Sequence, residues 1–482
     1  NQLTALTYAA SEHRYFVDGA PMVADAYISE WKTVLAGGLN AGGQGIYALD
    51  ITEPGSFSEA HADDIVLWEF TDEEDADLGY TYIQPVNNLF THQSAQIAKM
   101  ANGKWAVIIG NGYNNTEADG FVSTTGNAYL YILFIEDGMD GTWTAGSDYI
   151  KIDTGEGSVA TPNGLATPTP IDTDGDGDID VIYAGDLEGN LWKFDVSDSS
   201  TSNWENKVSG NKPLFTAKDS SNNIQAITSA PLVTRHPKGG YMVGFGTGKY
   251  MEIADLSTTS TQSLYGIRDL NTNINSRSGL IGQTVIDVQS VVDADVQSVV
   301  DADVQSVVDA TVTPSVTNKY RITTANIVDY PSDDGWFMDL PESGERMDLN
   351  PVIRDGRFVF ATRTPSTVPC ESGGDSWLME LDYLSGGRLD VSPFDVNSDG
   401  IINETDYLTI TVDIAGTMTD IKVPVSGFRS GAGGMISTPT VVKTDDPDVE
   451  YKILANSNGD ISTILESAQA DFSGRISWQE IQ

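Results

Sequence analysis

Short apolar runs alternate along the chain with clusters of Gly, Pro, Asn and Asp. Typical runs are Trp-Ala-Val-Ile-Ile at 105–109, Val-Ile-Tyr-Ala at 181–184 and Phe-Val-Phe-Ala at 358–361. These runs have the length of strands and are rich in β-branched and aromatic residues, whereas long patterns with a helical period are absent. The pattern therefore predicts an all-β protein.

A unit of three strands recurs along the sequence. Its first strand begins with a small residue, often Pro, its second ends in glycine, and its third has the form Leu-x-x-Leu-Asp. Six copies lie at 20–70, 94–132, 167–195, 229–268, 350–382 and 437–478, the last with its third strand at 474–478. Repeated units of three or four strands predict a β-propeller, in which each blade packs on its neighbours. We expect a trailing aromatic residue such as Trp68 to fill the space between blades.

The spacing between the fourth and fifth copies is nearly double the others, which favours a degenerate seventh blade between Asn271 and Pro341. We interpret 271–341 as an insertion in a single propeller domain that spans 1–482. It contains an octad, Asp-Val-Gln-Ser-Val-Val-Asp-Ala, that occurs three times over 287–310. Exact repetition indicates low complexity, and the β-branched Val residues favour extended structure. We expect a surface insertion; a partner-binding arm is the alternative.

The chain is strongly acidic. Its formal net charge is −44, from 26 basic and 70 acidic side chains. This charge argues against nucleic acid as a partner and favours cation binding. The single cysteine, Cys370, excludes an intrachain disulfide, and no apolar run has the length of a membrane helix, so membrane insertion is not expected. Because the chain begins at Asn1 without Met or a signal peptide, we expect a processed or truncated product.

Residues 172–180 read Asp-Thr-Asp-Gly-Asp-Gly-Asp-Ile-Asp. Like charges at this spacing repel by about 1–3 kcal/mol per pair, whereas Ca²⁺ accepts six to eight oxygens from a flexible loop. The expected ligands are the carboxylates of Asp172, Asp174 and Asp176, the carbonyl of Asp178, and the carboxylate of Asp180. Position twelve of an EF-hand would be Tyr183, so the closing ligand is assigned to Asp180. The alternative is a solvated acidic turn.

A second candidate calcium loop occupies residues 395–406 and resembles EF-hand and dockerin loops. The expected ligands are Asp395, Asn397, Asp399, the carbonyl of Ile401, Asn403 and Asp406. Gly400 stands at the sharp turn, and Asp406 replaces the usual Glu. We interpret this loop as an insertion between the fifth and sixth repeats; a plain Asx-rich turn is the alternative.

Two enzymatic or ligand-binding alternatives remain open. The blade ends at 48–50 and Trp68 are similar to motifs of quinoprotein dehydrogenases, but the adjacent cysteine pair of those enzymes is missing. A carbohydrate-binding or carbohydrate-hydrolysing propeller is the other alternative, because acidic residues abound. The four histidines show no metal or triad spacing, and no Gly-x-Ser-x-Gly motif is present. Cys370 lies near Glu371 and Asp375, which disfavours a reactive thiolate.

Several motifs together resemble one family. They are Gly-Gly-Leu-Asn-Ala-Gly-Gly-Gln-Gly-Ile-Tyr-Ala-Leu-Asp at 37–50, the run 172–195, Phe-Gly-Thr-Gly-Lys-Tyr at 245–250, Trp-Leu-Met-Glu-Leu-Asp at 377–382 with the glycines at 386–387, and Arg-Ile-Ser-Trp at 475–478. In this order they resemble the PilY1-type proteins, the tip-associated adhesins of type IV pili. The resemblance spans essentially the whole chain.

The resemblance implies the C-terminal propeller of such a protein, a modified seven-bladed ring without enzymatic activity. It implies Ca²⁺ as the cofactor of the 172–180 loop, which would govern pilus extension and retraction. It also implies an extracellular location at the pilus tip, minor pilins as partners, and a host or abiotic surface contacted through a missing N-terminal region. Cys370 is then expected to be buried or paired with a cysteine of that region.

Overall fold

The computed structural model of the chain describes residues 15–86, 95–208, 210–292, 317–330, 332–368, 373–414, 416–446 and 448–468. The chain divides into two compact units. The first comprises Asn1–Pro231 with Asn271–Asn275, and the second comprises Leu232–Leu270 with Ser276–Gln482. Both units consist of strands and short turns, as the apolar pattern predicts. No helix within the described ranges is long and apolar enough to cross a membrane.

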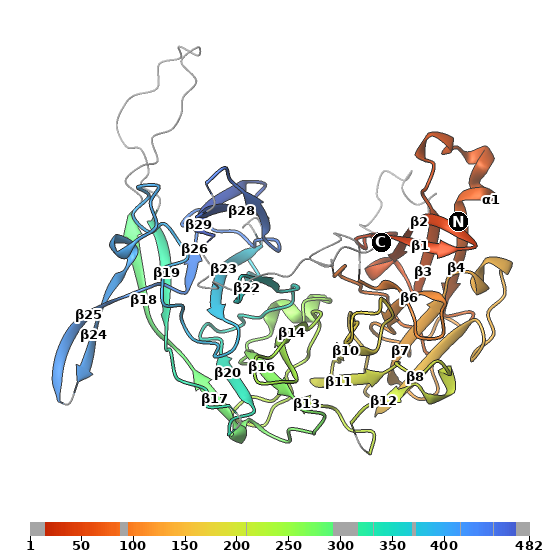
Figure 1. The fold of residues 1–482 in the computed structure, drawn as a ribbon, viewed down its shortest axis with the longest axis horizontal. Coiled ribbons are helices and arrows are strands. Elements are labelled where there is room, and N and C mark those ends of the chain that lie inside the picture. The colour runs from red at the N-terminus through yellow and green to blue at the C-terminus, as the bar shows by residue number, and fades with distance from the viewer. Residues whose placement is uncertain are drawn as a thin grey trace, which may run out of the picture. The chain divides into compact units, whose positions relative to one another are not determined.

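The first unit contains three sheets, drawn in red to yellow in Figure 1, and each sheet corresponds to one of the first three sequence repeats. The first sheet has the order β1 (Met22–Ile28), β2 (Glu30–Gly38), β3 (Gly45–Asp50) and β4 (Val66–Thr71). The second has the order β5 (Ile97–Lys99), β6 (Trp105–Gly110), β7 (Asn127–Phe134) and β8 (Tyr149–Gly157). The third has β9 (Thr169–Ile171), β10 (Val181–Gly185), β11 (Asn190–Asp195) and β12 (Glu205–Asn206), with β13 (Phe215–Thr216) also paired to β11. All their ladders are antiparallel.

The second unit contains the sheets of the last three repeats. The fourth repeat forms β14 (Leu232–Arg235), β15 (Tyr241–Gly246) and β16 (Ser263–Asp269), followed in the sheet by β20 (Gly335–Asp339) and β17 (Leu280–Gln283). The fifth forms β21 (Val352–Arg354), β22 (Arg357–Pro365) and β23 (Gly374–Asp382), joined by β26 (Gly427–Arg429), β19 (Thr317–Thr323) and β18 (Val285–Val292). The sixth forms β27 (Thr440–Lys443), β28 (Val449–Ala455) and β29 (Ile461–Ser467). A hairpin of β24 (Leu408–Ile414) and β25 (Thr417–Val423) pairs only within itself among the described strands (Figure 1).

Helical segments within the described ranges are short and lie in the connections. They are α1 (Ala62–Ile65) and the 3₁₀ turns η2 (Asn40–Gly42), η3 (Pro54–Ser56), η4 (Glu59–His61), η5 (Asp137–Asp140), η6 (Thr201–Asn203), η7 (Ile253–Ser257), η8 (Arg277–Gly279) and η9 (Glu404–Asp406).

In its described part, the segment 271–341 adds strands to the neighbouring sheets and forms no sheet of its own. Its strands β17 and β20 extend the fourth sheet, while β18 and β19 extend the fifth. The physical reason is that three-stranded units leave an open edge, which these segments cover. In the sixth repeat the third described strand is β29. Residues 474–478, which the sequence interpretation assigned to that strand, lie outside the described residues.

The octad repeat begins inside a strand. Residues 287–292 belong to β18, which pairs with β19. This confirms the extended structure expected from the β-branched residues for that part of the repeat. Residues 293–310 lie outside the described residues, as does Cys370.

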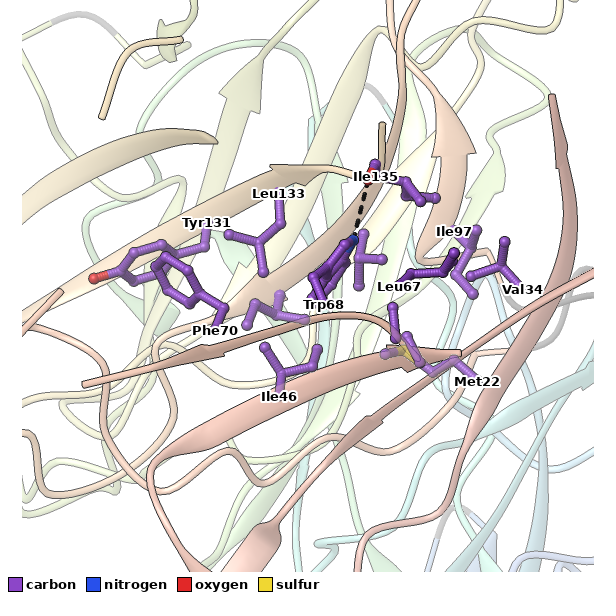
Figure 2. Close-up of a cluster of buried hydrophobic side chains, with 14 of the residues drawn as sticks. Met22, Val34, Ile46, Leu67, Trp68, Phe70, Ile97, Tyr131, Leu133 and Ile135 are labelled. Carbon is purple, nitrogen blue, oxygen red and sulfur yellow. Dashed lines mark hydrogen bonds between the residues drawn. The ribbon is translucent and has the colours of Figure 1, made fainter. Parts of the chain in front are cut away.

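Aromatic residues fill the space between the first two sheets, as expected from the sequence. Figure 2 shows Trp68 and Phe70 of β4 facing Tyr131 and Leu133 of β7. The Trp68 indole is 3% exposed, and its Nε1 donates a hydrogen bond to the backbone oxygen of Ile135 at 3.2 Å. The bond satisfies the one polar atom of this side chain inside the apolar layer. The contact confirms the predicted packing role of Trp68.

Candidate metal centre

The nine residues 172–180 connect β9 to β10 in the third sheet. Gly175 and Gly177 have positive φ angles of 87° and 93°. Glycine adopts this backbone conformation without steric cost, whereas other residues are strained there. The two glycines therefore allow the chain to curl so that alternate side chains face the same point.

Three carboxylates converge in this loop. Asp172, Asp174 and Asp176 each offer one oxygen, and these oxygens lie within 4.8 Å of one another. In the described part of the chain they form the one group of three acidic side chains close enough to share an ion. The sequence predicted these three ligands together.

Asp172 organises the loop through backbone amides. Its Oδ1 accepts hydrogen bonds from the amides of Asp174 at 3.2 Å and Gly175 at 2.7 Å, and its Oδ2 accepts one from Gly177 at 2.9 Å. Asp174 and Asp176 repeat the pattern, each accepting from the amide two residues later. These bonds hold the loop curled and orient the carboxylates before any ion is considered.

The side chains of the other two predicted residues, Asp178 and Asp180, make contacts of their own. Asp180 Oδ2 accepts hydrogen bonds from the amide and hydroxyl of Thr173, at 2.8 Å and 2.6 Å. The Asp178 carboxylate lies 2.7 Å from the ammonium group of Lys99, which leaves its carbonyl as the expected ligand. Neither side chain joins the group of three. Asp180 thus closes the loop through Thr173.

Lys99 and Thr173 are site residues that the sequence interpretation missed. Lys99 ends β5 in the preceding repeat, and its backbone oxygen accepts a hydrogen bond from the Ile179 amide at 2.9 Å. The loop is therefore fixed to the second sheet at its C-terminal end. In the sequence, only its position between two aspartates marks Thr173 as a possible site residue. The ion pair between Lys99 and Asp178 joins two different repeats, so no local motif indicates it.

The second candidate loop, 395–406, is organised around two aspartates. Asp406 in η9 is fully buried, and its carboxylate accepts hydrogen bonds from the amides of Val396 at 2.8 Å, Asn397 at 3.3 Å and Asn403 at 2.8 Å. Asp395 accepts from the amides of Asp399 at 3.2 Å and Gly400 at 2.8 Å. Burial, together with the charges of Asp406 and Asp399, raises the pKa of Asp395.

The remaining predicted ligands of this loop also bond within it. The Asn397 amide nitrogen donates to Asp399 at 3.0 Å. The Asn403 amide nitrogen contacts the Ile401 backbone oxygen at 3.4 Å, and its amide oxygen accepts from the Thr405 amide. This arrangement fits a calcium loop and an Asx-rich turn alike, so both interpretations of 395–406 stay open.

The donor set of the first loop fits a hard cation. Three carboxylate oxygens and a nearby carbonyl are ligands that Ca²⁺ accepts, and two of the three aspartates are exposed, which leaves room for water in the remaining positions. Thiolate or imidazole ligands, which softer transition metals prefer, are absent from the loop sequence.

A separate groove of about 1010 Å³ lies between β8 and residues 201–211 of the first unit. Ile150, Ile152 and Trp204 form its apolar part, and lysine and acidic side chains line the rest. Its described lining contains neither His nor Cys.

Comparisons with known proteins agree with the motifs. The family model described as "PilY1 beta-propeller domain" matches residues 1–301. The type IV pilus biogenesis factor PilY1 of Pseudomonas aeruginosa strain PAO1 is 32% identical over 519 residues, covering 100% of this chain and 39% of that protein. A PilY1 homolog of Xylella fastidiosa strain Temecula1 is 34% identical over 387 residues, covering 78% of this chain and 23% of the homolog.

A solved structure agrees as well. The crystal structure of the Pseudomonas aeruginosa PilY1 C-terminal domain matches with a TM-score of 0.69 and 28% sequence identity, over 94% of this chain and 85% of that domain. The chain spans about two fifths (39%) of the length of the Pseudomonas relative. The all-β propeller prediction and the family resemblance are both confirmed. The chain therefore belongs to the PilY1 family, and its sheets are those of a PilY1 β-propeller domain.

Proposed function

We propose that this chain is a calcium-binding, non-enzymatic propeller module of a type IV pilus biogenesis factor. It acts outside the cell at the pilus tip, docks on minor pilins, and regulates pilus extension and retraction. Family membership supports the pilus assignment, because the relatives are named as type IV pilus biogenesis factors. The observation that carries the calcium assignment is the convergence of Asp172, Asp174 and Asp176 within 4.8 Å.

The proposed regulation follows from charge. Without a cation the repulsion between the three carboxylates opposes the amide hydrogen bonds that curl the loop, so the loop opens more readily. With Ca²⁺ bound it closes, and its shape is transmitted through Lys99 to the second sheet and through β10 to the third. An ordering change of this kind alters the surface that a partner contacts.

We extend the proposal to the 395–406 loop. Its last residue, Asp406, lies two residues before β24 begins at Leu408. An ion held by Asp395 and Asp399 would fix the direction in which this hairpin leaves the sheet. The fully buried Asp406 would then mainly hold the loop backbone in place, because its carboxylate already accepts hydrogen bonds from three backbone amides.

Calorimetric titration of the chain with CaCl₂ tests the first loop. The triple variant Asp172→Asn, Asp174→Asn, Asp176→Asn removes three charges with little change in shape. The matched control, Glu59→Gln, Asp63→Asn, Asp64→Asn, removes three charges from exposed residues around α1. We expect the loop variant to lose one bound ion and the control to lose none. Equal binding by both would refute the metal assignment.

The pilus assignment needs the full-length protein in cells. Cells carrying the loop variant are expected to show altered surface piliation and retraction as calcium is varied, and weakened capture of minor pilins, while control cells behave like wild type. If cells with the loop variant and control cells behave alike at all calcium levels, the regulatory proposal is refuted. Quinone-dependent dye reduction or sugar turnover by the purified chain would contradict the non-enzymatic assignment.

A further inference from the structure

A second group of acidic side chains lies in the first unit, away from both candidate loops. Asp72 follows the end of β4, and Asp119 lies in the connection between β6 and β7. Gln44 links the two residues, because its side chain contacts Asp119 and its backbone oxygen contacts the Asp72 amide. Burial, together with the negative charge of Asp119, raises the pKa of Asp72. A shared proton or a bound cation would relieve the repulsion between two neighbouring carboxylates.

Gln44 is fixed between these two aspartates. Its Nε2 donates to Asp119 Oδ2 at 3.2 Å, and its backbone oxygen accepts from the Asp72 amide at 3.2 Å. The residue is only 8% exposed, and its Oε1 is buried without a hydrogen-bond partner in the structure. An unpartnered carbonyl oxygen costs free energy when it leaves water. The Oε1 atom of Gln44 is therefore an unpaired acceptor beside two carboxylates, and a bound cation would satisfy it.

The surrounding charges are also negative. Glu74 adds its charge to Asp72, and Glu117 accepts a hydrogen bond from the nearby Tyr80. Among the described residues, neither Asp72 nor Asp119 forms an ion pair with Lys or Arg. The neighbouring Asp75 and Asp77, in contrast, share the ammonium group of Lys151, each at 2.8 Å. Within the described part of the chain, Asp72 and Asp119 therefore have more hydrogen-bond acceptors than donors around them and no Lys or Arg partner.

We propose that Asp72, Asp119 and Gln44 Oε1 form a further site for a hard divalent cation, Ca²⁺ in an extracellular setting. Two carboxylates and one amide oxygen suit this ion, and water supplies the other ligands of a half-exposed site. The ion joins residues around β3 and β4 of the first sheet to the β6–β7 connection of the second. The three residues are far apart in sequence and match no linear calcium motif. The site is independent of both candidate loops.

The test uses a full-chain background in which both loops are disabled by Asp172→Asn, Asp174→Asn, Asp176→Asn, Asp395→Asn and Asp399→Asn. Equilibrium dialysis with radioactive Ca²⁺ at neutral pH is expected to show one ion per chain, with an affinity of about 10⁻⁴–10⁻³ M as in other extracellular modules. Adding Asp72→Asn and Asp119→Asn should remove this ion, whereas the exposed neighbour Glu73→Gln should leave it. Because the loops are already disabled, the result does not depend on the proposed loop sites.

A second variant guards against misfolding of the double substitution. Gln44→Glu adds a third carboxylate at the position of the amide and is expected to tighten calcium binding at this site about tenfold. Absence of a bound ion in the background, or unchanged binding after Asp72→Asn and Asp119→Asn, would overturn the proposal. A background chain that becomes more stable from pH 7 to pH 5, with no response to calcium, would show that the pair shares a proton instead.

Discussion

Lys99 places a positive charge beside the carboxylate loop. Its ammonium group contacts Asp178 at 2.7 Å, although the ligand expected from that residue is the carbonyl. This charge repels a cation that enters the loop, although solvent screening weakens the repulsion. We expect Lys99→Gln to tighten calcium binding by about threefold to tenfold. Calorimetric titration measures the change, and Lys104→Gln, which removes a lysine paired with Asp137, is the matched control. Weaker binding by Lys99→Gln would mean that its anchoring of the loop outweighs its charge.

The stability of the fold should depend on pH through Asp77, and the contacts of Asp77 decide the direction. Burial alone raises the pKa of Asp77, but hydrogen bonds from Lys151 and Ser123 outweigh it and lower the pKa. A carboxyl with a depressed pKa in the folded state stabilises the fold above its unfolded pKa. That stability is lost as the pH falls through the folded value. We expect Asp77→Asn to cost about 1.5–3 kcal/mol in the free energy of unfolding at pH 7.

Denaturant unfolding of both proteins at pH 7 and below pH 4 measures this difference. The difference in the free energy of unfolding between wild type and Asp77→Asn should be smaller at acid pH. Asp137→Asn, at the more exposed pair with Lys104, should change stability by less than about 1 kcal/mol at either pH. A gap that persists unchanged in acid would show that the Asp77 carboxylate contributes through shape rather than charge.

Individual residues could be predicted from the sequence only where their partners are close along the chain. Asp172, Asp174 and Asp176 lie in one loop, so alternate spacing was enough to place their carboxylates together. Asp180 was assigned as a ligand, but its bonds to Thr173 depend on how the loop curls. Lys99 and Gln44 were not identified, because their importance arises from contacts with distant residues that no local pattern encodes.

The curled loop depends on the backbone of its glycines. Gly177 has a φ of 93°, and a Cβ added there would meet no atom within 4 Å. Gly177→Ala therefore introduces backbone strain of about 1–2 kcal/mol without a clash. We expect this strain to oppose the closed loop and to weaken calcium binding by about tenfold, measured by calorimetry.

Gly103 in the β5–β6 turn provides a matched control for this substitution. It has a φ of 84° and equally open surroundings, so Gly103→Ala carries similar strain away from the aspartates. It should lower thermal stability to a similar extent and leave calcium affinity unchanged. If both substitutions weaken calcium binding equally, the effect is a general loss of stability rather than a property of the 172–180 loop.

Strands were predicted well where a sheet uses consecutive segments. The first three repeats each form a sheet in sequence order, and their apolar runs mark the strands. The fourth and fifth sheets instead recruit β20 and β26 from distant segments. Both strands lie inside their sheets, between partners that are distant in the sequence. The repeat pattern did not identify either segment, because it follows only consecutive strands.

At the scale of the whole molecule, calcium is expected to stabilise a highly acidic chain in two distinguishable ways. With a net charge of −44, any salt reduces self-repulsion and raises the melting temperature. Specific binding adds about 2.7 kcal/mol for each site at a hundredfold excess over its dissociation constant. Mg²⁺ at equal ionic strength supplies the screening but fits a flexible oxygen-rich loop poorly. The difference between the two melting curves therefore isolates specific binding.

The two compact units allow this difference to be assigned to a loop. The 172–180 loop belongs to the first unit and the 395–406 loop to the second. The variant Asp172→Asn, Asp174→Asn, Asp176→Asn should reduce the calcium-specific shift of the first unit to the part that the Asp72–Asp119–Gln44 site supplies. Asp395→Asn with Asp399→Asn should remove the shift of the second unit and leave that of the first unchanged. Hydrogen exchange during the melt, read on peptides from β10 and β28, separates the units because each peptide reports on its own sheet. If either variant abolished both shifts, calcium would act on the units jointly and the assignment of one ion to each loop would fail.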